Sequence, residues 1–139
     1  MKDGPQPARL DEARPDETTY VLSVEGDADL RLAPELGAHL KAAVTDGVRL
    51  VVVDLSQATL LDSTALGVLV RVAKRVRPLG TQLRLVVPQP QLRRIFEITL
   101  LDRVLPLHGT VDEARAAAAA QHARKPGAVD DAGIRRALG

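Results

Sequence analysis

Cysteine and tryptophan are absent from the chain, and Tyr20 and Phe96 are its only aromatic residues. Without cysteine, the chain can form neither a disulfide bond nor a thiolate metal site. With so few aromatic side chains, it has no platform on which the bases of a single-stranded nucleic acid can stack. We therefore expect a core built from leucine, valine, isoleucine and alanine.

No charge of one sign dominates the composition. The 139 residues carry a net charge of +1, so no strongly basic field attracts a phosphate backbone and we expect no nucleic-acid partner. No apolar run approaches the ~20 residues of a membrane-spanning helix, and the first residues lack the apolar segment of a secretory signal. We expect a cytoplasmic protein with no membrane partner. The scattered histidines and the lack of a glycine-rich phosphate loop predict no metal site and no cofactor.

The two ends of the chain differ in composition from its middle. Residues 1–17 are rich in proline and charged side chains, and residues 124–139 contain a proline and three glycines without a sustained apolar face. We predict a flexible N-terminal arm over 1–17 and a mostly disordered C-terminal tail over 124–139. One folded domain is expected over 18–123.

Four segments have the patterns of β-strands. Apolar residues alternate over 18–26, and we expect the glycine at the end of this segment to stop the strand. A β-branched run over 49–55 is typical of a strand buried on both faces. A further strand is expected over 81–87. The segment 103–107 predicts only a weak edge strand, because its proline cannot donate to a ladder.

Helical spacing of apolar residues marks the segments between these strands. The first helix is expected over 33–44, with Pro34 in its first turn. The second begins at the residues after Leu61 and ends before Pro78. A short helix is expected over 91–98, and an alanine-rich helix follows a capping box. Alternation of strands and helices indicates an α/β fold with parallel strands joined by right-handed crossovers.

A polar triplet, Asp62-Ser63-Thr64, stands at the start of the second helix. A short oxygen-bearing side chain there caps a helix, since it accepts a hydrogen bond from a free amide of the first turn. A phosphate on Ser63 would also be tolerated, because the dipole is positive at this end. On a partner-binding surface, that phosphate would add about −1.5 to −2 charge beside Asp62 and repel the partner. A plain cap and a phosphorylation switch both fit the triplet.

Two enzymatic or signalling interpretations compete with this one. A serine hydrolase of this fold class has a Gly-x-Ser-x-Gly elbow, whereas Ser63 has no flanking glycine, and no motif places His39, His108 or His122 as its base. The second alternative is a phosphorelay receiver with Asp54 as the acceptor at a strand end.

In such a receiver, Asp27 and Asp29 would supply the acidic pair that holds magnesium. The lysine that a receiver needs is missing after the strand over 81–87. An aspartate that makes turn hydrogen bonds explains Asp54 more simply.

The second helix has a wider apolar arc than one face of a sheet requires. Leu69, Val72, Ala73 and Val76 define its inner stripe, and Leu66 and Val70 flank it. We interpret the first turn as an exposed apolar shoulder beside Ser63 that docks a partner. Burial between two helices would give the same pattern, and such a shoulder is also compatible with a homodimer.

Two stretches resemble one family. "LLDSTALGVLV" resembles the signature of the STAS domain of bacterial anti-sigma factor antagonists, and "VEGDADLRLAPEL" is similar to an earlier segment of that family. The resemblance covers about residues 18–122. It implies a single STAS-type domain with a mixed, mostly parallel sheet of about four to five strands and helices mainly on one face.

The resemblance also implies a switch protein that is not an enzyme. Such antagonists bind an anti-sigma factor of the histidine-kinase-like ATPase fold and so release the sigma factor that it holds. The anti-sigma factor then phosphorylates the antagonist on a serine, and a phosphoserine phosphatase reverses this. STAS domains also serve, unphosphorylated, as scaffolds in stress-sensing assemblies or as accessory subunits of lipid-transport complexes.

Carried onto this sequence, the resemblance makes Ser63 the phosphoacceptor. The partner-binding residues that it implies are Gly26, Asp27, Asp29, Asp62, Ser63, Thr64, Leu66 and Gly67. Two positions depart from the family pattern. Ala65 stands where many members have glycine, which would stiffen the helix start and alter a partner's approach. Leu32 stands where a hydroxyl residue often caps the first helix, so we expect that cap to be weakened or moved.

Overall fold

The computed structural model describes residues 7–123, so the predicted C-terminal tail and the first six residues of the predicted arm lie outside the described residues. In chain order the elements are β1 (Arg9–Asp16), β2 (Thr19–Ala28), α1 (Ala33–Thr45), β3 (Leu50–Leu61), α2 (Ser63–Val76), the 3₁₀ helix η1 (Arg77–Leu79), β4 (Gln82–Val86), α3 (Pro90–Ile98), η2 (Leu101–Arg103), β5 (Leu107–His108) and α4 (Val111–Ala123).

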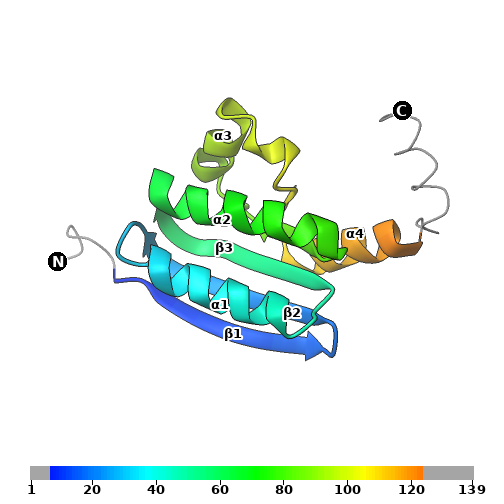
Figure 1. The fold of residues 1–139 in the computed structure, drawn as a ribbon. Helices are drawn as coiled ribbons and strands as arrows, with labels where there is room; N and C mark the ends of the chain where they lie inside the picture. Colours follow the sequence, from blue (N-terminus) through cyan, green and yellow to red (C-terminus); the bar gives the residue numbers. More distant parts are fainter. Residues whose placement is uncertain (1–6, 124–139) are drawn as a thin grey trace, which may run out of the picture.

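The five strands form one sheet in the order β1-β2-β3-β4-β5. β1 runs antiparallel to β2, and all the other neighbours are parallel. Figure 1 shows α1 and α2 side by side on one face of the sheet, whereas α4 packs on the opposite face. The predicted α/β fold, with a mixed, mostly parallel sheet and helices mainly on one face, is confirmed.

The first half of β3 is buried on both faces, as its β-branched run predicts. Val51 and Val53 face the core beneath α1 and α2. Val52, on the other face, packs in a smaller cluster with Ala114 and Ala118 of α4. Each fully buried valine of this kind stabilises the fold by roughly 1.5–3 kcal/mol relative to an exposed one. No described helix combines the length and the apolar character that a membrane span demands.

The prediction of a flexible arm over residues 1–17 is wrong for Arg9–Asp16, which form β1. The side chains of this strand are mostly exposed, so the segment carries no apolar pattern. Backbone pairing with β2 forms the strand. Glu12 adds a side-chain anchor, because its carboxylate accepts a hydrogen bond from the buried Tyr20 hydroxyl and lies 2.8 Å from Nδ1 of His39 on α1.

The hydrogen bonds of the Glu12 carboxylate also make this anchor dependent on pH. Those to Tyr20 and His39 hold the Glu12 pKa below its ordinary value. A carboxyl with a depressed pKa in the folded state stabilises the fold at neutral pH. That contribution is lost as the pH falls through the acid range.

Two strands run past their predicted ends. β2 continues beyond Gly26 to Ala28, with irregular register on both sides of that glycine. Gly26 has a φ of +82°, and a Cβ there would lie 2.2 Å from the carbonyl oxygen of Pro7. Gly26 therefore bends the strand beneath the chain that precedes β1, and does not end it.

β3 extends to Leu61, although its neighbour β4 already ends at Val86. The carbonyl groups of the overhang need donors from elsewhere. Nε2 of Gln89, just before α3, lies 2.7 Å from the Leu55 oxygen, 3.2 Å from that of Ser56 and 3.0 Å from that of Ala58. The side-chain amide of Gln89 thus supplies donors that β4 does not provide beyond Val86. This part of β3 is held by a polar contact, so the apolar pattern of the sequence ends before the strand does.

The weak edge strand predicted over 103–107 lies later and is shorter, at Leu107–His108. η2 occupies Leu101–Arg103 instead, and the Pro106 carbonyl accepts a hydrogen bond from the Leu85 amide at 2.9 Å. The four predicted helices are confirmed, α2 ending before Pro78 as expected.

Replacing Glu12 by alanine should destabilise the pairing of β1, the outermost strand, with β2. The buried Tyr20 hydroxyl would lose its acceptor, and we expect the free energy of unfolding to fall by about 1–3 kcal/mol, measured by urea denaturation. Glu12→Gln keeps an acceptor oxygen and should lose less. If Glu12→Ala is as stable as the unaltered chain, Glu12 does not anchor β1.

Candidate protein-binding site

The carboxyl ends of β2 and β3 meet at one edge of the sheet. The two strands are parallel neighbours, and Ala28 at the end of one pairs with Leu61 at the end of the other. The loop that leads to α1 and the start of α2 therefore emerge side by side, at the left of Figure 1. We call this region, residues 26–32 together with 59–67, the Ser63 edge.

Asp62 joins the two halves of the Ser63 edge. Its backbone is extended (φ −94°, ψ 176°), and its Oδ1 accepts a hydrogen bond from the Ala65 amide at 2.9 Å, which caps α2. Its Oδ2 accepts one from the Leu30 amide at 3.0 Å. A single carboxylate thus fixes the start of α2 and the loop after β2 relative to each other.

Because Asp62 caps the helix, the first turn of α2 does not require the hydroxyl of Ser63 as a hydrogen-bond acceptor. Ser63 is exposed and makes no side-chain hydrogen bond to any residue that the structure describes. Thr64 is exposed as well. The cap predicted within the triplet is thus Asp62, and the exposed hydroxyl of Ser63 is accessible to a modifying enzyme.

A stripe along α2 continues from Ser63 through Leu66, Gly67 and Val70, which are spaced i, i+3, i+4 and i+7. Leu66 and Val70 are half-buried and pack partly against the core. The predicted apolar shoulder is therefore only partly exposed. Gly67, between these two residues, adds no side chain, and a Cβ there would lie 3.4 Å from the Arg71 guanidinium.

Asp27 at the end of β2 and Asp29 in the loop that follows are both engaged in hydrogen bonds. Asp29 Oδ1 accepts from the Arg31 amide at 3.0 Å, and its Oδ2 lies 2.8 Å from Arg31 Nη2. These bonds from Arg31 hold the pKa of Asp29 below its ordinary value. Asp27 Oδ1 accepts from the Thr59 hydroxyl at 2.7 Å. Across the residues described, no group of three side chains could hold a metal ion.

The two departures from the family pattern have different outcomes. Leu32 caps α1 with no side-chain hydrogen bond, as expected, and the Asp29 carbonyl accepts from the Leu32 amide at 2.9 Å instead. Ala65 is fully buried. Its methyl group belongs to the core cluster beneath α1 and α2, and its effect on a partner's approach stays a prediction.

Sequence reasoning missed two exposed leucines at the Ser63 edge. Leu30 is 65% exposed and Leu60 is 43% exposed. In the segment "DLRL", two leucines two residues apart give no sign of which one is buried. The structure buries Leu32 and exposes Leu30.

The described part of the chain lacks the geometry that the serine hydrolase and phosphorelay receiver interpretations require. Asp54 lies inside β3, which continues to Leu61, and its side chain accepts a hydrogen bond from the Ser56 amide at 3.0 Å. The expectation that Asp54 ends a strand is therefore wrong. Each histidine contacts a residue other than Ser63: His39 contacts Glu12, His108 contacts Arg84 and His122 contacts Gln82.

Comparison with known proteins agrees with this fold. The family model of the STAS domain matches residues 12–114. The chain belongs to the STAS domain family. The match begins inside β1, which agrees with the correction of the predicted arm.

Several similar proteins are named as regulators. This STAS domain is 32% identical over 97 residues to the anti-sigma factor antagonist BtrV of Bordetella bronchiseptica, covering 70% of this chain and 84% of BtrV. It is 32% identical over 80 residues to the anti-sigma-B factor antagonist of Staphylococcus aureus, covering 58% and 74%.

Solved structures support the same fold. The crystal structure of an anti-sigma factor antagonist from Mycobacterium paratuberculosis superimposes with a TM-score of 0.75 at 30% identity, covering 83% of this chain and 97% of the other. The phosphorylated form of Bacillus SpoIIAA superimposes with a TM-score of 0.64 at 18% identity, covering 78% and 98%. At that identity the second likeness concerns the fold alone.

Asp62 offers a direct test of the Ser63 edge. Asp62→Ala removes both hydrogen bonds, and we expect a loss of about 0.5–2 kcal/mol from the cap alone, measured by chemical denaturation. Asp62→Asn keeps one acceptor oxygen and should lie between the two. Equal stability of all three proteins would contradict the bridging role of the carboxylate.

Proposed function

We propose that this STAS domain is an anti-sigma factor antagonist that is switched off by phosphorylation of Ser63. It binds an anti-sigma factor that is a serine kinase of the histidine-kinase-like ATPase fold, and the sigma factor is thereby released. The kinase transfers a phosphoryl group to Ser63, and a phosphoserine phosphatase restores the binding form. The observation that carries this proposal is the exposed hydroxyl of Ser63, which bonds to no residue among 7–123 and stands beside the capping residue Asp62.

A phosphate on Ser63 suits the protein but not a bound partner. Ser63 is the first residue of α2, where the positive end of the helix dipole stabilises an anion. The neighbouring Asp62 carboxylate already faces this region, so phosphorylation concentrates negative charge there. A partner packed over the edge would have to desolvate that charge, which costs binding energy. The fold therefore survives the modification while the interface does not.

The proposed contact surface combines polar and apolar groups. Leu30 and Thr64 are exposed, and Leu66 is half-buried and packs against the core. Protein interfaces are typically organised around such apolar anchors within a polar rim.

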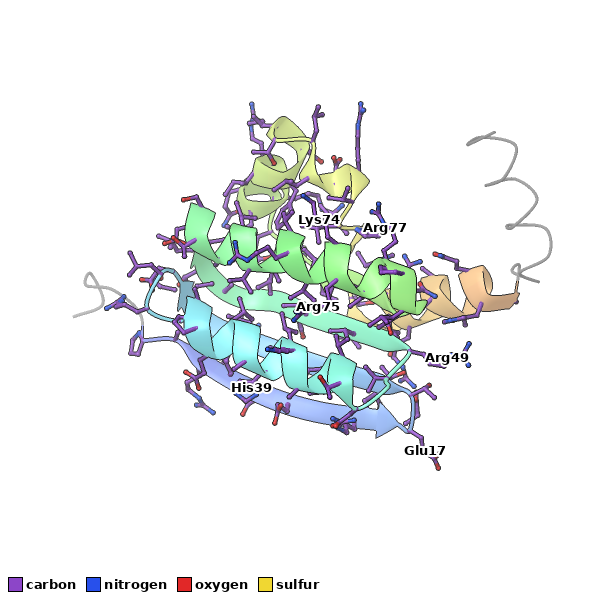
Figure 2. All side chains as sticks on the ribbon, viewed as in Figure 1. Glu17, His39, Arg49, Lys74, Arg75 and Arg77 are labelled. Atoms are coloured by element: carbon purple, nitrogen blue, oxygen red, sulfur yellow. The ribbon has the colours of Figure 1, made fainter. Side chains whose placement is uncertain are left out.

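A groove of about 720 Å³ between α1 and α2 extends this surface along the helices. Val68 and Val72 line it, and four basic side chains also border it: Lys41, Arg71, Lys74 and Arg75. Figure 2 labels Lys74 and Arg75 on α2. The basic border favours a partner with acidic residues opposite these two helices.

The first test is phosphorylation. Incubation with ATP and a candidate anti-sigma kinase should add one phosphate, detected by intact mass. Ser63→Ala should abolish this gain, whereas Thr64→Ala, which removes the neighbouring exposed hydroxyl, should keep it. Binding without any phosphate gain would contradict the switch and favour an unphosphorylated scaffold.

The second arm of the test measures binding. Ser63→Asp should weaken affinity for the kinase at least about tenfold, since it places a second charge next to Asp62, while Ser63→Ala should bind like the unaltered chain. Circular dichroism and thermal unfolding should show the same fold in both. If Ser63→Asp binds as tightly as the unaltered chain, phosphorylation of Ser63 does not control binding.

Leu30 should act as an apolar anchor of the interface. We expect Leu30→Ser to weaken partner binding, measured by calorimetry, about tenfold. The leucine side chain of such an anchor contributes more than about 1 kcal/mol to the binding free energy. The matched control is Leu79→Ser. Leu79 is 61% exposed but follows the opposite end of α2. Equal affinities for the two variants would place the interface elsewhere.

A further inference from the structure

A second pocket lies at the end of α2 opposite Ser63. It has a volume of about 330 Å³ and is lined by residues from the end of α2, η1, the start of β4, η2 and the last turn of α4. Arg77, Arg84 and Arg103 all line it, and no aspartate or glutamate does so in the part of the chain that the structure describes. Figure 2 shows Arg77 at this end of the helix.

Arg84 is the unusual member of this cluster, because it is only 8% exposed. Its guanidinium donates to Gln82 Oε1 at 2.8 Å and to Gln121 Oε1 at 2.6 Å. Its Nη1 lies 3.1 Å from Nε2 of His108. The hydrogen-bond partners of this buried cation are thus two amides and an imidazole, and none of them is an acid.

The imidazole of His108 does not supply the missing negative charge. Burial, reinforced by the charge of Arg84, lowers the pKa of His108. The ring is therefore neutral at physiological pH and accepts from Arg84 through Nε2. Burial likewise lowers the pKa of Arg84, yet an arginine keeps its proton in proteins. Within residues 7–123, no hydrogen-bonded acid offsets the positive charge of Arg84.

A buried charge without a counter-charge is costly, and proteins normally pair it. A guanidinium presents planar pairs of N–H donors that match the oxygens of phosphate and carboxylate groups. Three such groups around one small pocket, without an acid, complement an oxyanion. We propose that this pocket binds a small molecule through its phosphate or carboxylate group.

The pocket is separate from the Ser63 edge. α2 spans 14 residues, so at 1.5 Å per residue its two ends lie roughly 20 Å apart. A ligand in the pocket leaves the exposed hydroxyl of Ser63 uncovered. This inference therefore does not depend on the proposed antagonist function, and the failure of one leaves the other intact.

The chain itself is another source of carboxylates. Gln121 and His122 line the pocket, and the sequence that follows contains Asp130 and Asp131. The test must therefore distinguish a free ligand from these side chains.

The experiment is a titration of the ¹⁵N-labelled full chain with inorganic phosphate, followed by NMR at constant ionic strength. We expect saturable shifts at the backbone amides of 82–84 and 103. Arg103→Gln should weaken binding about tenfold, the value of one charge-assisted hydrogen bond. Arg94→Gln, which removes an exposed arginine of α3 outside this pocket, should leave the affinity unchanged.

Two results would overturn the proposal. Shifts that do not saturate, or an equal loss in Arg103→Gln and Arg94→Gln, would indicate general charge attraction without a site. Saturation that occurs only when Asp130 and Asp131 are both replaced by asparagine would assign the pocket to the chain's own carboxylates.

Discussion

The parallel pairing of β2 with β3 is the constraint on which the rest of the molecule depends. Two parallel neighbours must end at the same edge of a sheet, and a helix must cross over between them. α1 is that crossover, and the Ser63 edge is the place where both strands end. Asp62 then fixes this edge with its two oxygens. The strand topology thus determines where the candidate site lies, whichever side chains occupy it.

The sequence predicts the elements that bury an apolar face. The β-branched run of β3 and the helical spacing of α2 both correspond to buried stripes in the structure. The segments that it does not predict are held by polar contacts. β1 exposes most of its side chains and depends on backbone pairing and on Glu12. The end of β3 depends on Gln89, which is distant in the sequence.

The candidate site also has one part that the sequence predicts and another that it does not. The residues of the triplet could be singled out because their position between a strand and a helix is visible in the sequence. Which oxygen caps α2 could not be predicted, since Asp62 and Ser63 are both capping residues. The structure decides this by bringing the Leu30 amide to Asp62 from 32 positions away. The arginine pocket was also beyond sequence reasoning, because its members come from five elements.

Both margins of the sheet restrict how this domain can meet other proteins. β1, at one margin, carries both acidic and basic side chains as well as Pro15. β5, at the other, is two residues long and follows Pro106. Neither offers a long, flat row of free backbone groups on which a foreign strand could assemble. Association by addition of a foreign strand is therefore disfavoured. Such association is tight and can lead to fibrils. Contacts are left to loops and helices, where a partner can be exchanged quickly.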